Sequence, residues 1–175
     1  MTDAIDRHAS CDAEQTLRIE RLLPGSLERV WAWLTEPALR AKWLADGPME
    51  PRVGGQAELV WRNDELAPPP AERPEGVPAE NRMSCTITAW EPPHRLGFTW
   101  AGSGGVTFDL APRGDRVLLT VTHARVEKRS SLLSTAAGWH THLDILEAVA
   151  EGRTPPRFWP SWGALRATYE IRFAG

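Results

Sequence analysis

Residues 131–152 read SLLSTAAGWHTHLDILEAVAEG, and apolar side chains recur in this stretch at intervals of three and four residues. The recurring side chains are Leu132, Ala136, Trp139, Leu143, Leu146 and Ala150. The interval matches the 3.6-residue turn of an α-helix, so it predicts a long helix over residues 131–151 with one continuous apolar face. Gly152 stands where a helix C-cap is expected. Such a helix needs a broad apolar surface to cover its apolar face.

Five strand-like runs precede the helix, and apolar and polar residues alternate in each of them. The runs are Gln56–Asn63, Arg82–Trp90, His94–Trp100, Val106–Leu110 and Asp115–His123. A period of two gives each strand one face toward a core and one largely toward water. Short connections rich in Pro and Gly predict hairpins, and therefore an antiparallel meander.

A first strand and two short helices come before these runs. Gln15–Leu22 alternates like the later strands, and Pro24-Gly25 ends the alternation. Ser26 is a favourable helix N-cap, and Pro37 suits the first turn of a second short helix that ends near Leu44. The whole pattern predicts an α+β domain with a six-stranded antiparallel sheet and a long C-terminal helix.

Three segments lie outside this pattern. Residues 1–14 show no apolar periodicity, and we expect a loose N-terminal arm before a single domain over residues 15–175. Residues 64–80 contain five prolines and no apolar face, which predicts a long, mobile loop near a pocket mouth or an oligomer edge. The C-terminal extension, 157–175, has helical spacing overall and is predicted to be an extra helix, although Thr168–Phe173 alone also fits a strand.

Composition excludes several functional classes. The 175 residues carry a net charge of -3, whereas an electrostatic nucleic-acid binder needs a basic face. Two cysteines make neither a disulfide framework nor a cysteine-rich zinc site. No apolar run approaches the ~18 residues of a membrane span, and the polar, acidic N-terminus does not read as a signal peptide. We therefore expect a cytoplasmic protein with no nucleic-acid or membrane partner.

No motif for nucleotide binding, acyl transfer or metal binding is present. Gly102–Gly105 joins two strands rather than opening a helix, which favours a hairpin turn over a phosphate loop. His140 and His142 lie about 200° apart around a helix, so they cannot hold one metal ion, and we expect them at a solvated or rim position. Cys85 faces the core and reads as an inert thiol. We expect neither a metal nor a cofactor.

The order of these elements resembles the helix-grip fold of the START-like (SRPBCC) superfamily. Within it, the chain resembles the activator of heat-shock protein 90 ATPase homologue-like family over roughly Gln15 to Gly152. The resemblance rests on Ile19-Glu20-Arg21, Leu27–Trp31, Pro37–Trp43, Gly54-Gly55, Leu96–Trp100, Leu119–His123, Gly138-Trp139 and His142-Leu143. It implies that a curved sheet grips the long helix, with a pocket between the two and the short helices. Relatives bind or process apolar small molecules there, so the fold implies a cavity and not a chemistry.

Nine tryptophans, against one tyrosine and four phenylalanines, either fill the core or line this pocket. The side chains that strand and helix parity direct inward form the predicted ligand site: Trp43, Trp61, Phe98, Trp100, Phe108, His123, Trp139 and Leu143. His123 continues an inward strand face, where it is either a core-edge histidine or a polar contact for a ligand. No catalytic residue can be named.

Three functional hypotheses follow. The first is a binding module whose tryptophan-rich apolar cavity holds a hydrophobic or aromatic small molecule. The second is an enzyme of cyclase or hydrolase type acting on such a metabolite, for which His123 is the one acid–base candidate. The third is a co-chaperone-like interaction module, with a protein partner or as a homodimer, which predicts a large exposed apolar patch. An open, partly polar cavity would favour the first hypothesis over the third.

Overall fold

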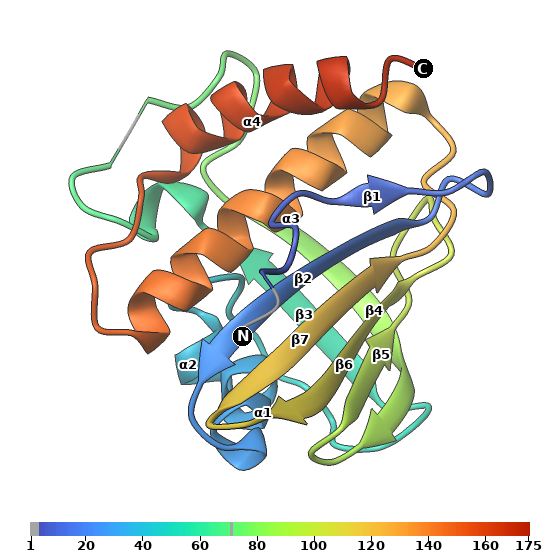
Figure 1. Cartoon of the computed structure of the whole chain (residues 1–175), viewed down its shortest axis with the longest axis vertical. Helices are drawn as coiled ribbons and strands as arrows, with labels where there is room; N and C mark the ends of the chain where they lie inside the picture. Colours follow the sequence, from blue (N-terminus) through green and yellow to red (C-terminus); the bar gives the residue numbers. More distant parts are fainter. Residues whose placement is uncertain (1–3, 71) are drawn as a thin grey trace.

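The computed structural model describes residues 4–70 and 72–175, and these form an α+β fold in which a curved antiparallel sheet holds a long helix (Figure 1). The strands are β1 (Ser10–Cys11), β2 (Leu17–Pro24), β3 (Gln56–Trp61), β4 (Asn81–Glu91), β5 (Arg95–Phe98), β6 (Val106–Arg113) and β7 (Arg116–His123). The helices are α1 (Leu27–Thr35), α2 (Pro37–Arg40), α3 (Arg129–Ala150) and α4 (Phe158–Arg172), with a 3₁₀ turn, η1, at Asn63–Glu65. The predicted helix-grip fold is confirmed.

The sheet has the order β1-β2-β7-β6-β5-β4-β3, and all neighbouring strands are antiparallel. The chain forms the predicted meander from β3 to β7, and β7 then pairs with β2 along its whole length, from Leu17↔His123 to Pro24↔Arg116. The register between β4 and β5 shifts between Ile87 and Ala89, where the sheet bends. The sheet has seven strands rather than six, because the two-residue strand β1 extends one edge.

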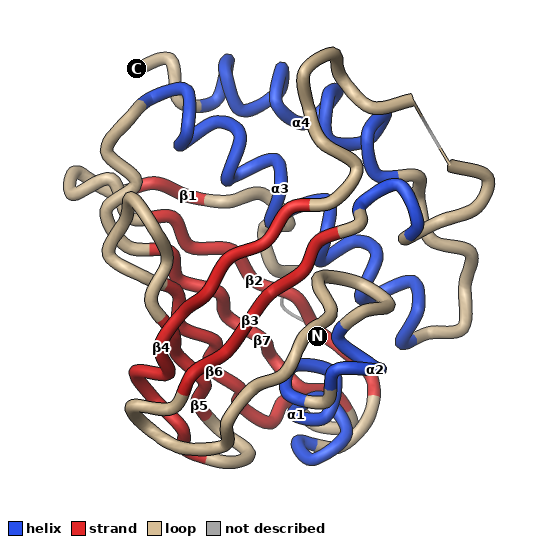
Figure 2. The backbone as a smooth tube through the Cα atoms, turned by 180° about the vertical axis from the view of Figure 1, so that it is seen from behind, coloured by secondary structure: helices blue, strands red, loops and turns tan. Residues whose placement is uncertain are grey.

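Helix α3 lies across one face of the sheet (Figures 1 and 2). Most side chains of its predicted apolar face are buried. Ala136, Leu143 and Leu146 have no exposed surface, so the helix stripe and the inward strand residues share one core. Gly152 follows the helix with φ +70°, the left-handed conformation of the expected C-cap.

Helices α1 and α2 close one end of the sheet (Figure 2). Ser26 caps α1 as predicted, since its hydroxyl accepts a hydrogen bond from the Arg29 amide at 3.2 Å. The fully buried Arg40 donates to backbone carbonyls of Leu34, Thr35, Ala45 and Gly47, which ties α1 to the segment after α2. Burial lowers the pKa of Arg40 to about 10, so the guanidinium stays charged at neutral pH.

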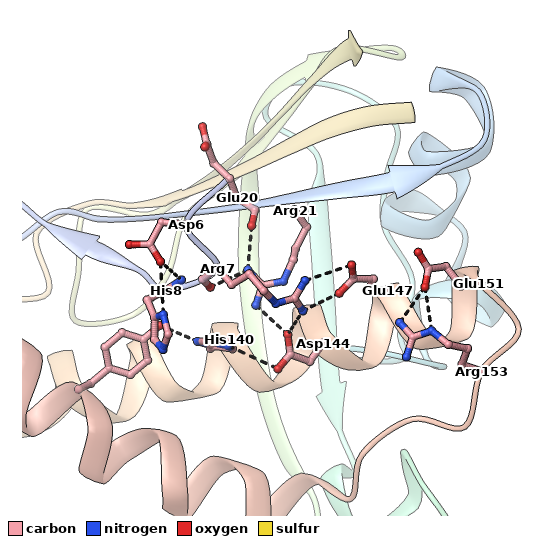
Figure 3. A network of polar contacts seen from close by, with 11 residues as sticks. Asp6, Arg7, His8, Glu20, Arg21, His140, Asp144, Glu147, Glu151 and Arg153 are labelled. Atoms are coloured by element: carbon pink, nitrogen blue, oxygen red, sulfur yellow. Dashed lines mark hydrogen bonds and ion pairs between the residues drawn. The ribbon is translucent and has the colours of Figure 1, made fainter. Parts of the chain in front are cut away.

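The N-terminal arm is not loose from residue 4 onward, which corrects the prediction for residues 1–14; residues 1–3 lie outside the described part of the chain. Arg7 binds Asp144 at 2.8 Å and Glu147 at 2.6 Å on α3 (Figure 3). The Ala9 amide donates to the Tyr169 hydroxyl of α4 at 2.7 Å. These contacts are separated by well over a hundred residues in the chain, so no local pattern in residues 4–14 reveals them.

Helix α4 resolves the ambiguity of the C-terminal extension in favour of the predicted helix. It packs on the outer side of α3, away from the sheet (Figure 1). Trp162 donates its indole N–H to the Ser134 carbonyl of α3, and Trp159 donates to the Asp64 carboxylate at 2.7 Å. The second contact attaches α4 to the start of the proline-rich loop. Within the described residues, no helix combines the length and apolarity that crossing a membrane requires.

Candidate functional site

A cavity of about 600 Å³ lies between the sheet, α3 and α4. Its aromatic wall consists of Trp61, Trp100, Trp139, Phe158, Trp159 and Trp162. Five of the nine tryptophans therefore line a cavity, so the tryptophan excess does more than fill the core.

Half of the predicted ligand residues reach this cavity. Trp61, Trp100, His123 and Trp139 line it directly, and their rings form one cluster, with Trp100 centred 5.4 Å from Trp61, 5.0 Å from His123 and 5.7 Å from Trp139. The other four, Trp43, Phe98, Phe108 and Leu143, are buried in the core and do not line it.

Two of those core residues form a second layer that supports the wall. Phe98 stacks against Trp100 at 6.4 Å, and Phe108 meets the edge of Trp139 at 5.6 Å. The alternation of inward and outward residues in the strands correctly places these rings inside the protein. It does not distinguish the residues that line the cavity from those packed behind them.

Along one face of α3, the residues that line the cavity pass from an exposed mouth to a buried floor. Ser131 is exposed, Ser134 and Thr135 are half-buried, and Trp139 and His142 are buried. Exposed Glu127 and Lys128 line the mouth just before the helix. The mouth of the cavity is therefore polar, and the wall further in is largely aromatic with the two buried histidines His123 and His142 in it.

His123 lies in this wall with both ring nitrogens engaged. Trp139 donates its indole N–H to Nδ1 of His123 at 3.0 Å. Since an indole nitrogen can only donate, Nδ1 is the unprotonated nitrogen and the neutral ring carries its proton on Nε2. Nε2 lies 2.8 Å from Oγ of Ser103 and donates to it. Burial lowers the pKa of His123 to about 4, which keeps the ring neutral at pH 7.

This polarity is opposite to that of a catalytic serine–histidine pair. A serine is activated when a histidine nitrogen accepts its hydroxyl proton, but the nitrogen that faces Ser103 already holds a proton. The Ser103 hydroxyl points instead to the Trp100 carbonyl at 3.3 Å. The pair fixes the turn between β5 and β6 against the wall; it does not form a nucleophile.

The turn that carries Ser103 approaches its neighbour closely. The Gly104 amide donates to the Ala124 carbonyl at 2.6 Å, and a Cβ on Gly104 would lie 2.9 Å from the Ala124 side chain. The predicted hairpin role of Gly102–Gly105 is thus observed, and the glycine allows the turn to pack beside the end of β7.

The expectation of a solvated or rim position for His140 and His142 is wrong, because both side chains are buried. His142 lines the cavity, three residues beyond Trp139 on the same helix face. That spacing is visible in the sequence and could have identified His142 as a pocket residue.

His140 belongs to a separate polar cluster beneath the N-terminal arm (Figure 3). Its Nδ1 lies 2.8 Å from the Tyr169 hydroxyl, and its Nε2 lies 3.5 Å from the Asp144 carboxylate. Neither His140 nor Tyr169 lines the cavity, so this histidine–carboxylate pair has no access to a ligand there. Within residues 4–70 and 72–175, no group of three His, Cys, Asp or Glu side chains is placed to hold a metal ion.

Two further segments contribute to the lining: helix α4, which the sequence did not assign to the site, and the proline-rich loop, which was predicted to lie near a pocket mouth or an oligomer edge. Phe158, Trp159 and Trp162 come from α4, and residues 77–79 come from the proline-rich loop. The position of α4 depends on long-range packing, which helical spacing does not encode.

Comparison with known proteins gives a consistent result. A family model described as "Activator of Hsp90 ATPase homolog 1-like protein" matches residues 24–151. A Bordetella parapertussis protein solved by solution NMR is 35% identical, with 98% of this chain and 95% of that chain covered and a TM-score of 0.74. No curated protein matches the chain.

Two more distant structures share the fold alone. CalU16 from Micromonospora echinospora is 20% identical, with 94% and 93% of the two chains covered and a TM-score of 0.63. A conserved protein of unknown function from Enterococcus faecalis is 18% identical, with 94% and 88% covered and a TM-score of 0.70. Helix α4 lies outside the residues that the family model matches.

Proposed function

The chain belongs to the Activator of Hsp90 ATPase homolog 1-like family, and from this premise we propose that it is a binding module for a hydrophobic or aromatic small molecule. The observation that carries the proposal is the cavity of about 600 Å³, walled by aromatic rings and polar at its mouth. Its volume lies in the range of roughly 300–1,000 Å³ in which proteins hold small organic ligands.

The alternatives have less support. An interaction module should expose a broad apolar patch, but in the described residues the large apolar side chains that are well exposed are Val53 and Ile171 alone. General acid–base catalysis at neutral pH works best with a group whose pKa is near 7, whereas burial lowers the pKa of His123 and His142 in the cavity wall to about 4. A binding role without catalysis therefore fits the site best.

Gly138 offers a sharp test of the cavity. It lies on the cavity face of α3, and a Cβ added there would meet no atom within 4 Å. A leucine at this position therefore extends into the cavity without displacing the core, and it also favours the helix over glycine.

The experiment titrates wild-type protein and Gly138→Leu with 2-naphthol and 2-methoxynaphthalene by isothermal calorimetry. We expect saturable binding to the wild type and none to Gly138→Leu, whose unfolding midpoint should be unchanged or higher. Gly163→Leu is the matched control, since Gly163 is an exposed helical glycine of α4 with equally open surroundings and does not line the cavity. Absence of binding to the wild type, or equal binding to Gly138→Leu, would reject the proposal.

A further inference from the structure

The floor of the cavity contains one side chain with an unused hydrogen-bonding atom, His142. Its ring packs against Phe158 with the centroids 4.7 Å apart, and only 6% of the residue is exposed. Because α3 rises about 1.5 Å per residue, His142 lies about 16 Å further along the helix than Ser131 at the mouth.

The backbone fixes the tautomer of His142. Its Nδ1 lies 2.7 Å from the carbonyl oxygen of Trp43, and a carbonyl oxygen can only accept a hydrogen bond. Nδ1 therefore carries the proton, and Nε2 presents a lone pair. Burial lowers the pKa of His142 to about 4, so the ring is neutral at pH 7 and Nε2 is an acceptor and not a donor.

Nε2 of His142 has no hydrogen-bond partner within the described chain, yet it is not enclosed. Side-chain atoms that are both fully buried and unpartnered in residues 4–70 and 72–175 are Nε of Arg21 and Oδ1 of Asn63. Nε2 of His142 does not belong to this group, so it keeps accessible surface, and His142 is one of the residues that line the cavity. Oδ1 of Asn63 also belongs to a lining residue, but it has almost no accessible surface and is closed to a ligand.

The other acceptor in the buried part of the wall is already occupied. Nδ1 of His123 receives the Trp139 indole proton, and Nε2 of His123 donates to Ser103. The remaining buried lining residues, Leu44, Trp61, Val126 and Phe158, have no side-chain acceptor.

We propose that His142 selects the ligand: Nε2 accepts a hydrogen bond from a neutral donor group on an aromatic body, such as the hydroxyl of a phenol, which enters the cavity first. This inference rests on the proposed binding function and deepens it. A phenol with an ordinary pKa near 10 is uncharged at pH 7 and can donate. The corresponding ether has the same aromatic surface but no proton to donate, so it leaves Nε2 desolvated without a partner. Selection against the ether is the expected consequence.

The test compares two ligands that differ in that proton. By calorimetry at pH 7, we expect 2-naphthol to bind the wild type about tenfold more tightly than 2-methoxynaphthalene, the scale of one buried hydrogen bond. His142→Asn is the matched variant, because the asparagine amide nitrogen can replace Nδ1 as donor to Trp43 but leaves no acceptor at the position of Nε2. This variant should bind both ligands with similar affinity, because it offers no acceptor at that position to the naphthol hydroxyl and leaves none unpartnered by the ether.

A second measurement does not depend on the folding of the variant. The ¹⁵N chemical shift of His142 Nε2 in the wild type should move toward the protonated value when 2-naphthol binds and stay unchanged with 2-methoxynaphthalene. Equal affinity of the wild type for the two ligands, or an unperturbed Nε2 resonance with bound naphthol, would overturn the role of His142 alone. Failure of both ligands to bind the wild type would instead overturn the proposed function and this inference with it.

Discussion

Trp139 of helix α3 donates a hydrogen bond to His123 at the end of strand β7, with 3.0 Å between the two nitrogens. The contact joins the helix to the sheet inside the cavity wall, where both side chains are buried. This hydrogen bond also occupies the lone pair on Nδ1 of His123, the histidine that the alternation of strand residues placed at the cavity wall. His123 lines the cavity as predicted, but both of its ring nitrogens are engaged in hydrogen bonds within the protein.

This pair predicts a coupled loss of stability. Trp139→Phe leaves Nδ1 of His123 without its donor, and His123→Phe leaves the indole N–H without its acceptor, so each should reduce the free energy of unfolding by about 1–3 kcal/mol. The double variant should lose less than the sum, because it leaves no orphaned partner. Urea unfolding of the four proteins measures this, and simple additivity would contradict a direct contact.

Trp139→Ala should lower the free energy of unfolding further, by about 3–5 kcal/mol, because it also removes packing.

The buried histidines predict a loss of stability in mild acid. Burial lowers the pKa of His123, His140 and His142 to about 4 in the folded protein. The unfolded chain binds more protons between about pH 6.5 and pH 4, so stability is full above this range and is lost as the pH falls through it. From pH 6.5 to pH 5 the loss should be about 1.5 kcal/mol for each histidine.

Urea midpoints measured from pH 7 to pH 5 test this dependence. His142→Asn should show a shallower decline than the wild type, because one titrating group is gone. Parallel declines would indicate that His142 does not contribute.

We predict that the proline-rich loop controls ligand entry and release, and that Asp64 holds the loop in place. The Asp64 carboxylate accepts from the Trp159 indole at 2.7 Å and also binds Arg73, so it connects the loop to α4 at the cavity. Asp64→Ala should speed both association and release of 2-naphthol, with little change in the unfolding midpoint. Stopped-flow fluorescence measures the rates, and Glu72→Ala, an exposed change in the same loop, is the control. If the backbone amides of residues 72–80 exchange hydrogen as slowly as those of β4, the loop does not move in this way.

Leu143 tests the placement of the long helix. It is completely buried between α3 and the sheet, so Leu143→Asp would bury a charge without a partner and should destabilise the protein by about 3–5 kcal/mol. Ile171→Asp on α4 should change stability by less than about 0.5 kcal/mol, because that side chain is 79% exposed. Thermal unfolding of both variants provides the comparison, and an unchanged midpoint for Leu143→Asp would refute the placement.

Local patterns were sufficient for most of the architecture. The alternation in the strands, the Ser26 cap and the three-and-four spacing over residues 131–151 each express a preference that a few neighbouring residues settle among themselves. Their order then determined the antiparallel sheet and the helix that it grips. Parity also directed Trp61, Trp100, His123 and Trp139 toward one interior.

The site itself depended on contacts between distant parts of the chain. Whether His142 is a rim histidine or a buried acceptor depends on the Trp43 carbonyl, which lies 99 residues away. The N-terminal arm is held by Asp144 and Tyr169 in the same way, and α4 adds a wall to a cavity that no local period describes. A periodic pattern states which face of an element is apolar, but it does not state which partner covers that face. Tertiary packing therefore decided which aromatic rings line the cavity, and which nitrogen at its floor is left free for a ligand.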